Sequence, residues 1–104
     1  MEKKPRKRQG MKRNSSPVMV SVKILFITRM QKYSGQREVL MELPSDPRQA
    51  VDSIIERFDI PWKGSLEKST RVFINKTLAD VFIGSGKDLH NGDAIAFIPI
   101  SGGG

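Results

Sequence analysis

The chain has 104 residues, which suits one domain and leaves little room for a second. Its hydrophobic fraction of 38% is enough for a folded core, and the absence of cysteine excludes disulfides and cysteine-ligated metal sites. The net charge of +7 is concentrated at one end, because residues 1–17 contain seven basic residues and one acidic residue. Eleven basic and ten acidic residues remain, so a nearly neutral domain follows a basic tail.

Residues 1–18 are predicted to be a disordered basic tail, since residues 1–17 have almost no apolar content and end in Asn14-Ser15-Ser16-Pro17. Such a tail either binds RNA, a membrane or a partner, or is a solvated extension without a dedicated role. Met11 and Met19 lie where alternative translation starts could be. The chain has no apolar run of membrane-spanning length and no recognisable signal peptide, so we expect a cytoplasmic protein without a membrane partner.

Two strands are predicted to form a hairpin at the start of the domain. Val20 to Met30 alternates at first and then becomes continuously apolar from Ile24 to Ile27, which is typical of a central strand that is covered on both faces. Gln31 to Gln36 contains Ser34-Gly35 and is predicted to be a turn. Arg37 to Leu43 alternates again and is predicted to pair with the first strand.

One main helix is predicted to follow. Asp46 can cap it, Pro47 suits its first position, and Pro61 requires it to end near Phe58. The apolar residues that recur at helical spacing on one face are Ala50, Val51, Ile54, Ile55 and Phe58.

The second half of the domain is predicted to be mostly extended. The segments are a connection over Asp59–Ser69, a strand over Arg71–Asn75, a short extended piece over Leu78–Ile83, a loop over Gly84–Lys87, a tight turn over Leu89–Asp93 and a last strand over Ala94–Ile100. This element order predicts an α+β fold of the β-grasp type, a mixed four- to five-stranded sheet with one main helix on one face. The domain should span residues 19–100, and residues 101–104 should form a flexible glycine tail.

The last sixteen residues carry a recognisable pattern. Leu89 is followed by the Gly92-Asp93 turn, an apolar strand and a final Gly103-Gly104. This segment resembles the end of the MoaD/ThiS family of ubiquitin-like sulfur carriers, and residues 19–104 fall within the resemblance. Phe73-Ile74-Asn75 also matches, although Lys76 stands where the family commonly has glycine. Gly102 replaces a Thr, Ser or Ala that is usual at that position.

The resemblance implies that the working group is the carboxylate of Gly104. An adenylating enzyme would use ATP to form an acyl-adenylate there, and a sulfur donor protein would convert it into a thiocarboxylate. No cofactor or metal bound to this chain is implied. Ser101, Gly102 and Gly103 would thread into the partners' active sites, since glycine fits narrow channels. Residues 100–104 reach at most about 17 Å when extended.

The same resemblance suggests where partners dock. The expected surface is the sheet face opposite the helix together with the base of the tail, and its candidate residues are Phe97, Ile98, Pro99 and Ile100. Strand alternation places Phe97 and Ile98 on opposite faces, so only some of the four should be exposed.

The leading functional hypothesis is the small subunit of molybdopterin synthase, in molybdenum or tungsten cofactor biosynthesis, acting with a larger catalytic subunit. Pro99 favours this branch over the thiamin-pathway carriers. A second hypothesis is a ubiquitin-like modifier that is joined to lysines of target proteins. The sequence leaves open which pathway receives the sulfur, and tRNA is one of the candidates. An RNA-binding module based on the basic tail is more remote, because the chain has one Trp and one Tyr for stacking on bases.

An enzyme acting alone is not expected. His90 is the single histidine and falls in a turn, and Asp93 is interpreted as a turn residue. The chain contains no carboxylate pair with catalytic spacing and no cluster with metal-ligand spacing.

Overall fold

The computed structural model describes residues 18–100. In chain order the elements are β2 (Met19–Phe26), the 3-10 helix η2 (Thr28–Met30), α1 (Gln31–Ser34), β3 (Glu38–Pro44), α2 (Pro47–Arg57), α3 (Ser65–Ser69), β4 (Thr70–Ile74), β5 (Thr77–Leu78), α4 (Ala79–Gly84) and β6 (Ala94–Pro99). Five strands and one long helix within this range confirm the predicted α+β class. Within the described range, no helix has the length and apolar character needed to cross a bilayer.

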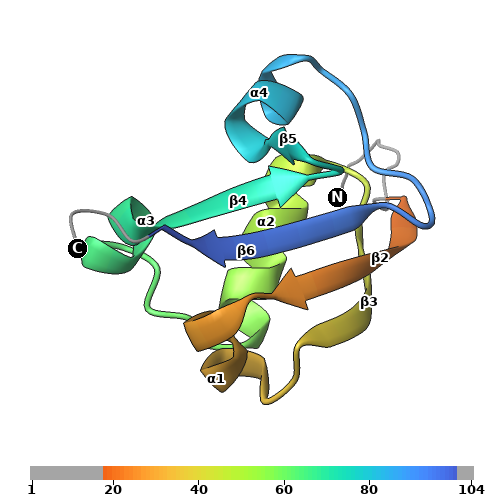
Figure 1. The fold of residues 1–104 in the computed structure, drawn as a ribbon. Helices are drawn as coiled ribbons and strands as arrows, with labels where there is room; N and C mark the ends of the chain where they lie inside the picture. The colour runs from red at the N-terminus through yellow and green to blue at the C-terminus, as the bar shows by residue number, and fades with distance from the viewer. Residues whose placement is uncertain (1–17, 101–104) are drawn as a thin grey trace, which may run out of the picture.

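The strands form one mixed sheet in the order β3-β2-β6-β4-β5 (Figure 1). β2 is antiparallel to β3 and parallel to β6, and β4 is antiparallel to both β6 and β5. The last strand of residues 18–100, β6, is therefore the middle strand of the sheet. As predicted, β2 lies in the interior of the sheet and forms a hairpin with β3.

The first strand is shorter than its apolar run suggested. β2 ends at Phe26 rather than Met30, because the backbone turns at Thr28, which has a positive φ of 46°. The side chain of Met30 is fully buried, so the apolar character of this stretch belongs to a helical turn packed on the core. The predicted turn at Ser34-Gly35 is confirmed as the end of α1, where Gly35 adopts a φ of 77°.

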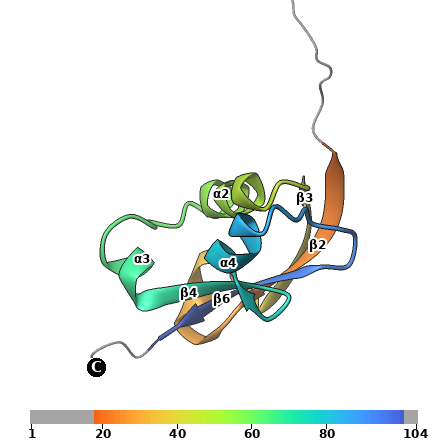
Figure 2. The same cartoon turned by 90° about the horizontal axis from the view of Figure 1, so that it is seen from above.

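The helix α2 covers one face of the sheet (Figure 2). Its start confirms the predicted cap, since Asp46 Oδ1 accepts hydrogen bonds from the backbone N–H of Arg48 at 2.9 Å and of Gln49 at 3.4 Å. Ala50 and Ile54 are fully buried, as the helical spacing predicted. The helix ends at Arg57 with Phe58 as its cap residue.

Two short helices replace segments that were predicted otherwise. Residues 65–69 form α3 within the predicted connection. The expected extended piece over Leu78–Ile83 is wrong beyond Leu78, because residues 79–84 form α4. The β-branched residues of α4 favour a strand locally, but packing of Ala79, Phe82 and Ile83 on the core outweighs that propensity.

The core lies between α2 and the sheet and contains an aromatic cluster. Phe97 of β6 stacks on Phe26 at a ring distance of 5.7 Å, and it meets Trp62 edge-on at the same distance. Phe58 contacts Phe26 edge-on at 5.2 Å. This cluster ties the middle strand to the end of α2 and to the connection that follows it, and it fixes the position from which the chain leaves the sheet.

Candidate functional site: the open face of the sheet and the root of the tail

The sheet face that points away from α2 is apolar at its centre, and we call it the open face. It contains a hollow of about 590 Å³, and the side chains that line it are Leu25, Ile27, Phe73, Asn75, Lys76, Ala94, Ala96 and Ile98. These residues come from the middle strands β2, β6 and β4 or from the segments that follow β2 and β4. An exposed apolar surface of this kind is typical of a binding site.

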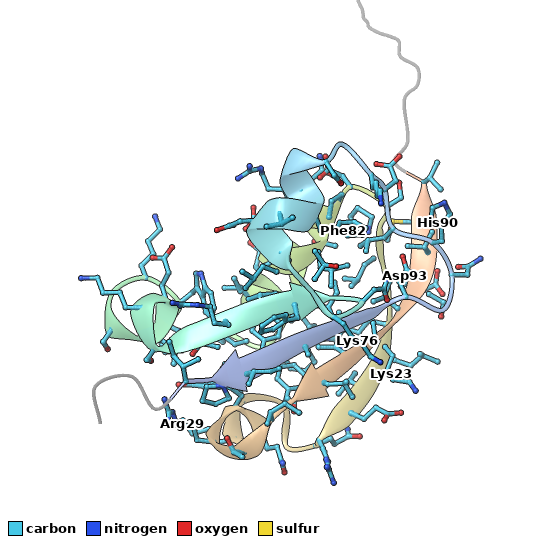
Figure 3. The ribbon with its side chains drawn as sticks, turned by 45° about the horizontal axis from the view of Figure 1, so that its top comes forward. Lys23, Arg29, Lys76, Phe82, His90 and Asp93 are labelled. Atoms are coloured by element: carbon cyan, nitrogen blue, oxygen red, sulfur yellow. The ribbon has the colours of Figure 1, made fainter. Side chains whose placement is uncertain are left out.

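Cations surround this apolar centre. Lys23 is paired in register with Ala94, and Arg71 with Ile98, so both extend from strands of the open face. Figure 3 shows Lys23 and Lys76 near the beginning of β6, whereas Arg29 lies near its end. Lys23 Nζ lies 3.8 Å from Glu38 Oε2, but within residues 18–100 neither Arg71 nor Lys76 pairs with a carboxylate. The face therefore suits a partner with an apolar centre and peripheral carboxylates.

The turn that joins β4 to β5 forms one rim of the open face. Asn75 and Lys76 both have positive φ, 50° and 73°. Two successive residues with positive φ define a type I′ hairpin, which usually contains Asn-Gly. Asn tolerates this conformation, but Lys does not favour it, so the backbone of Lys76 is strained. This is the position at which the sequence resemblance would lead one to expect glycine.

The turn before β6 is built around Gly92, which has a φ of 91°. The side chain of Asn91 accepts a hydrogen bond from Ser21 N–H at 2.8 Å, and Asp93 Oδ2 accepts one from His90 N–H at 2.8 Å. The predicted turn is thus confirmed. The carboxylate of Asp93 closes the turn, and the exposed His90 contributes its backbone.

The four candidate interface residues divide along the strand. Phe97 is fully buried beneath α2, so its assignment to a partner surface is corrected to a core role. Ile98 points the other way and lines the hollow of the open face. Pro99 and Ile100 are half-buried at the end of β6. The sequence predicted that Phe97 and Ile98 point to opposite faces. It did not predict which of these two side chains points into the core, because that depends on the register of β6 with β2.

The chain leaves the sheet at a defined point. Ile100 N–H donates to the carbonyl oxygen of Ser69 at 2.9 Å, which holds the root of the tail against α3. Ser101, Gly102, Gly103 and Gly104 follow, and they lie outside the described residues, as do residues 1–17. Their predicted roles, and the domain boundaries at residues 18 and 101, stay predictions.

Sequence reasoning missed most of the open face. Leu25 and Ile27 were interpreted as part of a strand that is covered on both faces. In the structure their side chains line the hollow of the open face. Phe73 was assigned to a strand and to the family resemblance but not to a docking surface, and Ala94 and Ala96 were not singled out. The signal was present in the alternation, because these outward positions of three neighbouring strands are all apolar where a solvated face would be polar.

Comparisons with known proteins place the fold. No family model and no curated protein matches the chain. A solution structure of small archaeal modifier protein 1 (SAMP1) from Methanosarcina acetivorans matches with a TM-score of 0.64 at 18% identity, covering 84% of this chain and 99% of that one. A solution structure of the Haloferax volcanii HVO 2177 protein matches with a TM-score of 0.62 at 18% identity, covering 91% and 99%. The chain therefore has the predicted ubiquitin-like β-grasp fold.

Proposed function

We propose that the chain is a ubiquitin-like carrier whose working group is the carboxylate of Gly104. The observation that carries this proposal is the junction at the end of β6. There the middle strand of a β-grasp sheet, which bears part of the apolar open face, leads directly into Ser101-Gly102-Gly103-Gly104.

The arrangement suits a protein that presents its end to other active sites. Ile98 contributes to the open face, and Ile100 is held two residues later by Ser69, so docking and presentation share one strand. A partner that binds the open face would receive the tail at a fixed distance from that contact. The four residues beyond Ile100 lack bulky side chains and allow entry into a narrow channel.

The proposed chemistry begins at an unreactive group, because a carboxylate is a poor electrophile. An oxygen of the Gly104 carboxylate attacks the α-phosphate of ATP in the activating enzyme, pyrophosphate leaves, and an acyl-adenylate forms. A sulfur nucleophile on a donor protein then attacks the acyl carbon and displaces AMP. When that nucleophile is the terminal sulfur of a persulfide, the product is an acyl disulfide. A second thiol on the donor side then attacks the donor's own sulfur, the S–S bond of the acyl disulfide breaks, a donor-side disulfide forms, and the thiocarboxylate is left on the carrier. The chain itself supplies no catalytic group in this scheme.

For the receiver of the sulfur, our first candidate is a molybdopterin synthase, with this chain as its small subunit. Pro99 and the apolar strand before the glycines support this assignment through the family resemblance. A larger subunit would hold the pterin precursor and would bind the open face. A carrier for thiamin synthesis is the alternative within the same family.

A protein modifier is a second candidate, favoured by the match to SAMP1, which is named a modifier. The acyl group of the same adenylate would then be transferred to a lysine amine of a target protein, which displaces AMP and forms an isopeptide bond. Both uses require the same activating step, so they differ only after Gly104 has been activated.

Intact-protein mass spectrometry tests the shared step. The protein, ATP, the adenylating enzyme of the same organism and a sulfur source should give an AMP adduct and then an exchange of oxygen for sulfur at Gly104. Deleting Gly104 should abolish both products, whereas the matched variant Ser101→Ala should retain them. Adenylation of the deletion variant, or no adduct on the intact chain, would contradict the proposal.

Two further measurements separate the receivers. Purification of the native protein should recover a larger pterin-binding subunit if the chain serves molybdopterin synthesis. Isopeptide-linked remnants of Gly104 on lysines of other proteins, detected in a digested lysate, would favour the modifier instead.

A further inference from the structure

The strand β3 forms an edge of the described sheet, and its outer backbone groups have no strand beside them there (Figure 1). The carbonyl of Arg37 accepts from Phe26 N–H and Ser45 N–H donates to Val18, so odd-numbered residues point their backbone groups toward β2. Backbone groups alternate along a strand. Glu38, Leu40 and Glu42 therefore point theirs outward, and the register with β2 runs through seven consecutive pairs without a bulge.

The same three residues present a distinctive set of side chains. Leu40 is 70% exposed, which is more than any other large apolar side chain of residues 18–100. Glu38 and Glu42 flank it at two-residue spacing, so all three side chains point to one face. An added strand would meet a carboxylate, an apolar side chain and another carboxylate.

A second copy of this edge is a poor match. An antiparallel pair centred on Leu40 would place Glu38 of each copy opposite Glu42 of the other, and like charges directly opposite are destabilising. The edge therefore disfavours its own copy and favours a strand with cations at alternate positions.

We propose that residues 4–8 of the basic tail pair antiparallel with β3 and cover this edge. Lys4, Arg6 and Arg8 alternate along the segment Lys-Pro-Arg-Lys-Arg. Their cations match the two glutamates when Lys4 lies opposite Glu42 and Arg8 opposite Glu38, although Glu38 also lies 3.8 Å from Lys23 Nζ of β2 on its other side. The aliphatic stem of Arg6 then covers Leu40.

Pro5 fits the same register. In an antiparallel ladder, two directly opposite residues of a hydrogen-bonded pair exchange both N–H···O bonds. A tail residue opposite Glu38, Leu40 or Glu42 therefore directs its backbone N–H and C=O toward β3. Lys4, Arg6 and Arg8 would bond to β3, whereas Pro5 and Lys7 would face away. A proline at an outward position loses no ladder hydrogen bond and prevents another strand from adding.

The connecting chain is long enough for this arrangement. Val18 accepts from Ser45 N–H, so the folded domain begins beside the Pro44 end of β3. The connection must run from Arg8, opposite Glu38, to Val18. That path covers about 20 Å along β3 and about 10 Å across two strand spacings. Residues 9–17 span up to about 30 Å when extended. Exposed ion pairs are individually weak. The covalent connection compensates for this weakness, because it raises the effective concentration of the tail near β3.

Amide hydrogen exchange in the full chain tests this pairing. The triple variant Lys4→Glu, Arg6→Glu, Arg8→Glu should speed exchange at the amides of Glu38, Leu40 and Glu42 by about five- to tenfold at low salt. The control reverses Lys3, Lys12 and Arg13 to Glu, which changes the net charge equally outside the paired segment, and it should retain most of the protection.

A charge exchange provides the second readout. Glu38→Lys with Glu42→Lys should lose the protection of Leu40, and adding Lys4→Glu with Arg8→Glu should restore it. Equal exchange rates in the wild type and the first triple variant would overturn the proposal. Protection that disappears on dilution would overturn it as well, because it would come from the tail of another molecule.

Discussion

Asn75 and Ala94 exchange two hydrogen bonds across the beginning of the middle strand. Asn75 N–H donates to the carbonyl oxygen of Ala94 at 2.9 Å, and Ala94 N–H donates to Asn75 Oδ1 at 3.0 Å. The β4–β5 turn is thereby fastened to β6 at the end opposite the tail. This relationship places Lys76 at the rim of the open face despite its unfavourable φ.

Two substitutions of Asn75 should show how much its side-chain hydrogen bond contributes to stability, apart from its positive φ. Asn75→Gly retains the positive φ but loses the acceptor for Ala94 N–H, so the free energy of unfolding should fall by about 1 kcal/mol. Asn75→Asp retains the acceptor and should remain within about 0.5 kcal/mol of the wild type. Urea unfolding followed by the fluorescence of Trp62 measures both, and equal losses in the two variants would count against the side-chain bond.

Relieving the strain at Lys76 should stabilise the domain. Lys76→Gly removes a left-handed conformation that costs a side-chain-bearing residue about 1–2 kcal/mol, against a glycine entropy cost of about 0.5–1 kcal/mol. The free energy of unfolding should therefore rise by about 0.5 kcal/mol. Lys76→Ala retains the Cβ and serves as the control, since it should give no such gain. A loss of stability in Lys76→Gly would contradict the strain assignment.

The open face should be required for partner binding but not for folding. Ala96 lies between Leu25 and Phe73 in register, at the centre of the apolar hollow. Ala96→Glu should place a carboxylate there and raise the KM of the adenylation reaction at least tenfold, while the circular dichroism spectrum is retained. Asp52→Lys on the exposed side of α2 is the control and should leave KM within twofold. An unchanged KM in Ala96→Glu would remove the open face from the proposed mechanism.

The buried neighbour of Ile98 should behave in the opposite way. Phe97→Ala removes the ring that contacts Phe26 and Trp62, and it should lower the free energy of unfolding by about 3–5 kcal/mol. Ile98→Ala should cost less, because its side chain is only half-buried. Thermal unfolding monitored through Trp62 distinguishes them. Similar melting temperatures for the two variants would contradict the division of β6 into a core face and an open face.

Local signals in the sequence were sufficient for the hairpin, the Asp46 cap and the Gly92 turn, because each depends on neighbouring residues. The helix α4 was not predicted, since Val81, Phe82 and Ile83 favour extended structure until the core packs against them. The end of β2 was misplaced for a related reason. Met30 is as apolar as Phe26, but it reaches the core from a helical turn after the backbone has turned at Thr28.

The docking surface stays a prediction, but the apolar hollow lies on the face that was expected for it, and only part of its lining was foreseen. The face opposite the helix was the expected docking surface, and Ile98 lies on it. Phe97 was included because the alternation of β6 does not say which side α2 covers. Leu25 and Phe73 lie on neighbouring strands, and only the register of β2 and β4 with β6 brings them together.

The position of β6 between β2 and β4 also determines how the domain bears mechanical load. A partner that draws residues 101–104 into a channel pulls β6 along its own length. The hydrogen bonds to both neighbours then resist in shear, all at once, instead of opening one after another as they would in a peeled edge strand. Under the proposed function, a partner would thus grip the chain by its end without unravelling the sheet from the point where it is held.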